Sequence, residues 1–325
     1  MTTLATPSPF HEGELDVQRR LGVKDKIARF GERALVPFMP DEHREFLEQL
    51  PFVFVGALDV SGQPWASMVW GLPGFAEAPD AETVELASVI APGDPLRTNL
   101  VLGAPVGILA IELETRSRIR VNGTVLAREG DAFAVHVKQS FGNCQKYIQI
   151  REAKLRRDPS LPIESTPSPE GALLSPEATR IVTAADTFFI ASTSRHPSEP
   201  VINEGVDVSH RGGLPGFARL GEDGGRSTIT FPDYLGNFLF NTLGNIQVNP
   251  LVGLLFVDFE RGTLLSLAGE ATIVWDGPEV TAVDGAQRLV RVNVTSGVMM
   301  PEVLPFSWSA PSFAPQFRRM QHTPA

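Results

Sequence analysis

The chain has 325 residues, of which 42% are hydrophobic and 20% charged, a balance typical of a globular protein with a sizeable core. Its net charge of −10 argues against general binding to nucleic acid, because that depends on clustered lysine and arginine. One cysteine, Cys144, excludes an internal disulfide framework, and the amino terminus lacks the pattern of a secretion signal. We therefore expect a cytoplasmic protein with neither a nucleic-acid nor a membrane partner.

Residues 1–40 are expected to form an N-terminal arm with short helical pieces, and residues 41–157 a first domain rich in strands. This domain opens with a helix capped by Asp41, followed by an apolar strand over 51–60. Further short strands are expected over 65–75, 83–90, 106–113 and 118–126. Short strands at this spacing favour a β-barrel or sandwich over alternating βα units.

A helix is expected from about Asn143 to residue 157, followed by a linker over 158–177 that contains five prolines. Ser175 then caps a new helix that leads into a second strand-rich domain over 178–285, and residues 286–325 are expected to be a C-terminal tail. Within the second domain, the uncharged segment 234–257 is long enough to cross a bilayer. Its asparagines favour a buried helix followed by a buried strand instead.

Three sequence matches relate the two domains. GLPGF at 71–75 returns at 213–217, 142 residues later. VGIL from Val106 matches VGLL from Val252, and NGTV from Asn122 aligns with AGEA from Ala268, both 146 residues later. Ordered matches at nearly constant offset indicate a tandem duplication. We expect the two like domains to pack as a pseudo-dimer.

Candidate binding residues in the second domain begin with Ser209, Arg211, Gly212 and Gly213. Arginine beside a hydroxyl and glycine backbone suits a phosphate or a flat polar ring. The same residues also fit a glycine-rich hairpin with no ligand.

Asparagine recurs every four residues at Asn237, Asn241, Asn245 and Asn249. In a helix that starts near Asn237 these side chains form one polar stripe. The stripe either binds a ligand, together with N–H groups at the helix start, or divides into a cap, a turn and two solvated side chains.

The first domain has three alternating arginines, Arg116, Arg118 and Arg120, which a strand would place on one face. They either line a ligand groove or form a solvated strand face. Lys146 and Tyr147, in the helix expected from Asn143, are either further candidates for cationic and stacking contacts or part of a basic surface. The six histidines are scattered, so we predict no metal site. The dinucleotide, P-loop and hydrolase motifs are missing.

Together these segments resemble the pyridoxamine 5′-phosphate oxidase-like FMN-binding split-barrel family, in its branch with two barrels per chain. The resemblance covers roughly residues 10–275. It is carried by VDVSHRGGLPGF, PDYLGNFLFNTLGNI and NPLVGLLFVDF in the second half, and by PWASMVWGLPGF, GDPL, RIRVNG and FGNCQKYIQIRE in the first.

The resemblance implies a mainly β fold with a few helices, in which two tandem Greek-key split β-barrels of six strands pack as a pseudo-dimer. It also implies that FMN lies in the groove between them, with Ser209 and Arg211 near the flavin. Asn237, Asn241 and Thr242 fall where the family binds phosphate. The family's Arg-Lys positions hold Asn241 and Thr242 here, so the phosphate would need Arg211 or an arginine of the other half.

We therefore expect an FMN-binding oxidoreductase that acts on an unidentified small molecule. The alternatives are a non-catalytic module for another flat cofactor, haem or deazaflavin, and a scaffold that docks a separate reductase. A homodimer would also be compatible with the sequence. Trp70 and Tyr147 are candidates for stacking on the ligand, and Trp308 for closing the groove.

Overall fold

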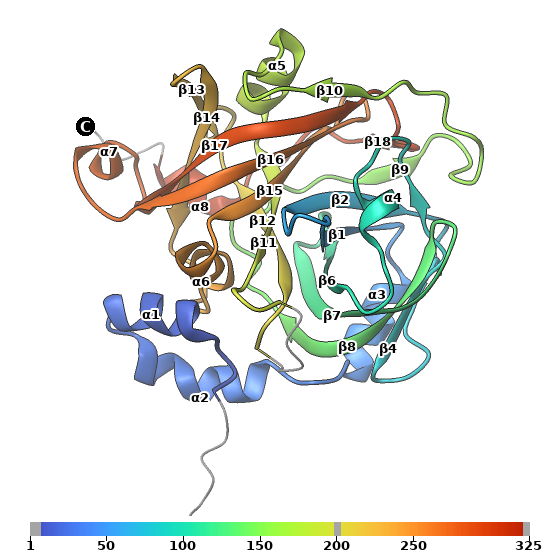
Figure 1. Cartoon of the computed structure of the whole chain (residues 1–325), viewed down its shortest axis with the longest axis horizontal. Coiled ribbons are helices and arrows are strands. Elements are labelled where there is room, and N and C mark those ends of the chain that lie inside the picture. The colour runs from blue at the N-terminus through green and yellow to red at the C-terminus, as the bar shows by residue number, and fades with distance from the viewer. Residues whose placement is uncertain (1–7, 198–202, 321–325) are drawn as a thin grey trace, which may run out of the picture.

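Two antiparallel sheets dominate the structure, a computed structural model that describes residues 8–197 and 203–320 (Figure 1). The first sheet contains, in spatial order, β3 (Ala76–Glu77), β4 (Thr83–Leu86), β8 (Ala132–Gly142), β7 (Ser117–Glu129), β6 (Pro105–Glu112), β1 (Phe52–Leu58), β2 (Pro64–Trp70) and β5 (Val89–Ile90). The second contains β13 (Arg219–Asp223), β14 (Arg226–Tyr234), β17 (Ala286–Met300), β16 (Thr263–Val274), β15 (Leu251–Asp258), β11 (Thr187–Thr193) and β12 (Val206–Gly212), with β10 (Ser168–Glu170) paired to β17.

Helices flank the sheets, and a two-stranded ribbon joins β9 (Ala153–Leu155) to β18 (Phe306–Trp308). The helices are α1 (Glu12–Arg20), α2 (Lys24–Ala34), α3 (Asp41–Glu48), α4 (Leu96–Asn99), α5 (Pro176–Ala184), α6 (Asn241–Val248), α7 (Pro278–Thr281) and α8 (Pro315–Met320). Ser175 caps α5 as the sequence predicts, because its hydroxyl accepts a hydrogen bond from the Ala178 amide. α3 starts at Asp41 itself, with Pro40 at the cap position.

The two sheets are copies of one another, as the sequence offsets predict. Reading both in the same direction, β3, β4, β8, β7, β6, β1 and β2 correspond to β13, β14, β17, β16, β15, β11 and β12. A register shift between Asn122 and Gly123 in β7 returns between Ala268 and Gly269 in β16. The fold is therefore two tandem split β-barrels, each with seven corresponding strands instead of the six that the resemblance implies.

The halves pack around a pseudo-two-fold axis that passes between equivalent aromatic side chains. Phe54 of β1 stacks on Phe189 of β11 with ring centroids 3.4 Å apart. A Cβ atom added to Gly107 would lie 2.6 Å from the Val206 carbonyl oxygen, and one added to Gly253 would lie 2.5 Å from the equivalent oxygen of Pro64. Both strand crossings thus require glycine, and the predicted pseudo-dimer is confirmed.

Three segments differ from the sequence prediction. The segment after Asn143 is not helical, because the carbonyl groups of Cys144 and Ile148 accept hydrogen bonds from arginines and β9 pairs with β18. The proposed linker contributes β10 to the second sheet. The proposed tail contains β17, a central strand of the same sheet, so this sheet extends past residue 285. Alternation of apolar and polar residues in β17 was the available signal.

The uncharged segment folds as predicted, into the buried helix α6 followed by the buried strand β15. Among the residues that the structure describes, no helix has the length and apolar character needed to cross a membrane.

Candidate functional site

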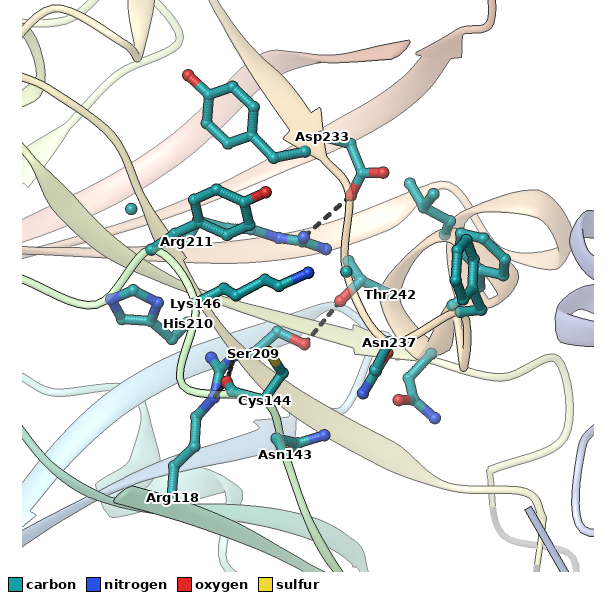
Figure 2. Close-up of a pocket in the computed structure, with 18 of the residues that line it drawn as sticks. Arg118, Asn143, Cys144, Lys146, Ser209, His210, Arg211, Asp233, Asn237 and Thr242 are labelled. Atoms are coloured by element: carbon teal, nitrogen blue, oxygen red, sulfur yellow. Dashed lines mark hydrogen bonds and ion pairs between the residues drawn. The ribbon is translucent and has the colours of Figure 1, made fainter. Parts of the chain in front are cut away.

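A concave pocket lies where the first half meets the second (Figure 2). The first half contributes β7 and the segment 143–147 that follows β8. The second half contributes β12, the end of β14 and the loop that leads into α6. The enclosed volume is about 110 Å³, and the whole concavity with its open side is about 800 Å³. The enclosed part alone is smaller than a typical whole-cofactor site.

Two cations in the pocket have no carboxylate partner among the described residues. Lys146 is half-buried and makes no hydrogen bond or ion pair with residues 8–197 and 203–320, and Figure 2 shows its side chain extending into the pocket. Arg118 donates from Nε to the Cys144 carbonyl oxygen at 2.9 Å. Burial and the neighbouring Arg120 and Arg211 together lower the pKa of Arg118 to about 9, with Cys144 opposing them. The pocket therefore carries uncompensated positive charge.

Arg120 is buried at the pocket floor and links the two halves. Its Nη1 donates to Asp207 Oδ2 at 3.1 Å and to Asn241 Oδ1 at 2.9 Å, and its Nη2 donates to Ser209 Oγ at 2.6 Å. Ser209 Oγ also lies 2.7 Å from Thr242 Oγ1. These contacts hold two hydroxyls of different elements side by side on the pocket wall (Figure 2).

A second charged group on the wall is centred on Asp233. Its Oδ1 accepts from Arg211 Nη1 at 3.1 Å, and its Oδ2 lies 3.3 Å from Arg288 Nη1. The buried His210 lies on the same strand as Arg211. Burial is the main cause that lowers the pKa of His210 well below its ordinary value, and the positive charges of Arg118 and Arg211 add to the effect. His210 is therefore neutral at neutral pH, and the local charge comes from the arginines.

Aromatic rings close one side of the pocket. Tyr147 stacks on Tyr234 with ring centroids 5.0 Å apart, and Phe317 of α8 packs against both. The Tyr147 hydroxyl donates to the Leu235 carbonyl oxygen at 3.0 Å, which connects the segment after β8 to the loop before α6.

The backbone is strained around the pocket. Tyr147, Phe238 and Phe240 all have left-handed backbone angles, with φ of 68°, 64° and 64°. Bulky residues rarely adopt this conformation, and those that do tend to cluster at functional sites. The turn before β7 adds Arg116, with φ of 63°.

The structure brings ten of the thirteen predicted binding residues together around this pocket: Arg118, Arg120, Lys146, Tyr147, Ser209, Arg211, Gly212, Asn237, Asn241 and Thr242. Gly212 allows a close approach, because a Cβ atom there would lie 2.0 Å from the Tyr147 carbonyl oxygen. Two of the ten differ in detail. Asn237 precedes α6, which starts at Asn241, and the Asn241 amide is engaged by protein groups on both sides.

The other three predicted residues lie outside the pocket. Arg116 sits in the turn before β7 and donates to the Ile148 carbonyl oxygen, so the expected face of three arginines has only two members on the strand. Gly213 packs against Phe217 in the turn after β12. Asn245 is buried and donates to Ser192 Oγ at 3.0 Å.

The tryptophans were misplaced by the sequence analysis. Trp70 is fully buried in the core between the halves, and Trp308 packs on Phe52 and Phe259 away from the pocket. Of the three aromatic candidates only Tyr147 lines the site.

Sequence reasoning missed the acidic and aromatic pair Asp233–Tyr234, and it also missed Glu14 of α1, whose carboxylate reaches Asn241. The pair directly precedes the Leu235–Gly236 turn, so its position beside a glycine was an available signal. Glu14 is separated from Asn241 by 227 residues and has no local signal.

Comparisons with known proteins assign no function. No family model matches the chain, and no curated protein matches it. Among solved structures, HupZ of Group A Streptococcus is 16% identical, with 38% of this chain and 90% of that one covered at a TM-score of 0.29.

Two further structures match a similar share of the chain. A putative pyridoxamine 5′-phosphate oxidase from Lactobacillus delbrueckii is 14% identical, with 39% of this chain and 93% of that one covered at a TM-score of 0.29. HutZ, a haem storage protein from Vibrio cholerae, is 14% identical, with 40% and 95% covered at a TM-score of 0.26. Each match spans about two fifths of this chain.

Proposed function

We propose that this protein is an FMN-binding flavoprotein and that the pocket between its halves holds the cofactor, with a small molecule as the redox partner. The observation that carries the proposal is a pair of cations, Arg118 and Lys146, beside the hydroxyls of Ser209 and Thr242. Neither cation has a carboxylate partner in the part of the chain that the structure describes. Buried cations without partners are costly, and an anionic ligand relieves that cost.

The donor set fits a phosphate. Lys146 is a mobile point charge, Arg118 a planar donor, and the two hydroxyls and the Asn237 amide are neutral groups within the same walls. The enclosed volume of about 110 Å³ suits a group of phosphate size. The ring of a flavin would extend toward the open side, past Tyr147 and Tyr234.

FMN, when bound, supplies hydride or one-electron chemistry. The chain's own residues would bind and orient it. Arg118 and Lys146 compensate negative charge, the Arg120 network holds Ser209 in place, and the tyrosine stack with Phe317 excludes water from one side.

Visible absorption of the purified protein tests the proposal directly. We expect a two-band flavin spectrum, or a saturable response to added FMN, and release of FMN on denaturation. A colourless protein that ignores added FMN overturns the proposal. A Soret band after addition of haem, with no response to FMN, would favour the haem alternative.

Lys146→Met tests the residue assignment, because Lys146 makes no hydrogen bond or ion pair with the described residues that the substitution would break. We expect FMN affinity to fall about 10- to 100-fold, the value of a charge-assisted hydrogen bond. Lys154→Met is the matched control, because Lys154 is 77% exposed and lies outside the pocket. Equal affinities of the two variants would place the phosphate elsewhere.

A further inference from the structure

The N-terminal helix α1 packs closely against α6, with Gly13 facing Gly244. A Cβ atom on Gly13 would lie 2.1 Å from the Gly244 carbonyl oxygen, and one on Gly244 would lie 2.6 Å from the Glu14 nitrogen. The two helices can approach this closely only because both positions are glycine. The approach places the Glu14 carboxylate against Asn241, the first residue of α6.

Asn241 is held between the Glu14 carboxyl group and the Arg120 guanidinium group. Its Nδ2 donates to Glu14 Oε1 at 2.7 Å, and its Oδ1 accepts from Arg120 Nη1 at 2.9 Å. The two contacts fix the orientation of the amide. Because Arg120 Nη2 donates to Ser209 on the pocket wall, a continuous chain of hydrogen bonds connects Glu14 to the pocket.

The groups around Glu14 are mostly acidic or neutral. The His11 backbone N–H donates to Glu14 Oε2 at 3.0 Å, and His11 Nε2, which has no hydrogen-bond partner, lies 3.6 Å from the same oxygen. Asp207 faces the cluster from β12 and Glu204 from the preceding loop, and Arg120 is the facing cation on β7. Asn245 of α6 and Gln139 of β8 complete the polar walls.

Burial decides the protonation of this cluster. It raises the pKa of Glu14 to about 8, with Asp207 adding to the effect and the His11 amide, Asn241 and Arg120 opposing it. Burial also lowers the pKa of His11, against the nearby Glu204, Glu12 and Asp207. At neutral pH Glu14 therefore holds a proton and His11 is neutral, so that Asp207 and Arg120 balance each other.

We propose that Glu14 is a positioning residue of the pocket and that loss of its proton weakens the binding of anions there. The inference rests on the proposed function only in requiring that the pocket binds an anion. A deprotonated Glu14 places a negative charge three hydrogen bonds from Ser209, in a buried region where solvent screens it little. By linkage, anion binding must favour the protonated form and take up protons from solution.

Calorimetry on the unmodified protein tests this without any mutation. Sulfate and FMN are titrated separately at pH 6.5, 7.5 and 8.5, in buffers of different ionisation enthalpy. We expect affinity to fall roughly two- to fourfold across this range, because a carboxyl with a pKa of about 8 is about three-quarters ionised at pH 8.5. Near pH 8 we expect uptake of about 0.3–0.5 proton per anion. An uptake of zero overturns the inference.

Glu14→Gln separates the contribution of Glu14 to the pH dependence of binding from that of Arg118, whose pKa of about 9 lies near the upper end of the range. We expect this variant to show a flat pH profile and, at pH 8.5, to bind sulfate and FMN roughly two- to fourfold more tightly than the unmodified protein. Structural damage alone would weaken binding at every pH. Retention of the original pH profile overturns the inference.

Asp16→Asn is the matched control, because it removes the same charge from the same helix at a position that is 50% exposed. We expect it to behave like the unmodified protein. Sulfate binding with proton uptake but no FMN binding would support this inference and refute the proposed function. FMN binding with no proton linkage would do the opposite.

Discussion

The pocket and its pseudo-symmetric counterpart share one backbone arrangement but differ in nearly every side chain. In the pocket, β7 presents Arg118 and Arg120, and β12 presents His210. The equivalent positions in the other half are Leu264 and Ser266 of β16 and Met68 of β2.

The counterpart region is packed with apolar side chains. Met68, Trp70 and Leu264 are buried in one core cluster with Val303, Leu304 and Phe306, which follow β17 as residues 143–147 follow β8. The same strand crossings thus produce a polar concavity on one side of the pseudo-axis and a buried apolar cluster on the other. The comparison shows that the duplicated fold provides two possible grooves, and that side chains on two strands determine which one stays open.

Exchanging the equivalent residues should produce the largest effect. We expect Leu264→Arg to destabilise the protein by about 3–5 kcal/mol, because it buries a charge without a partner in the apolar cluster. Arg118→Leu should change the free energy of unfolding by less than about 1 kcal/mol, because the loss of its bond to Cys144 is offset by relief of cationic repulsion. Urea unfolding of both variants measures the difference. Similar costs in both would mean that the two grooves are not as different as their side chains indicate.

A different buried acid lies next to the pocket and next to its pseudo-symmetric counterpart. Asp94 accepts from Ser67 beside the counterpart, and burial raises its pKa to about 6, whereas the pKa of Glu14 beneath the pocket is raised to about 8. A carboxyl whose pKa is higher in the folded state binds more protons when folded, so stability falls as pH rises between the unfolded and folded pKa values.

We expect the contribution of Asp94 to fall by about 3 kcal/mol from about pH 4 to 6, and that of Glu14 to fall by about 5 kcal/mol from about pH 4.5 to 8. Unfolding free energies measured across this range should flatten above pH 6 in Glu14→Gln. Asp94→Asn should retain the slope above pH 6. A slope above pH 6 that survives Glu14→Gln would contradict the assignment.

The smallest expected effect concerns the equivalent hydroxyls. We expect Ser209→Ala to weaken FMN binding about fivefold, because it removes one hydroxyl from the pocket wall and leaves Arg120 Nη2 without that partner. Ser67→Ala, at the equivalent position, should leave FMN affinity unchanged. The same titrations report stoichiometry, for which we expect one FMN per chain. Two would show that the counterpart also opens.

Sequence patterns predicted much of the fold and part of the candidate site. Alternating and apolar runs located most strands, and the offset matches identified the duplication. The helix expected after Asn143 failed because hydrogen bonds from Arg116 and Arg118, distant in sequence, hold that segment in an irregular conformation. Asn245 sits in the predicted helix, but its amide is committed to Ser192 within the core.

The sequence by itself determined that this protein has two copies of one β-barrel, and that cationic and polar residues gather unequally in them. Those properties reside in local periodicity and in similarity between segments, which a chain carries without folding. Only the tertiary structure decided which groove is open, because that depends on which side chains meet across the pseudo-axis. It also decided that Glu14, from the N-terminal arm, lies beneath the pocket, because the close helix contact at Gly13 and Gly244 exists only in the folded chain.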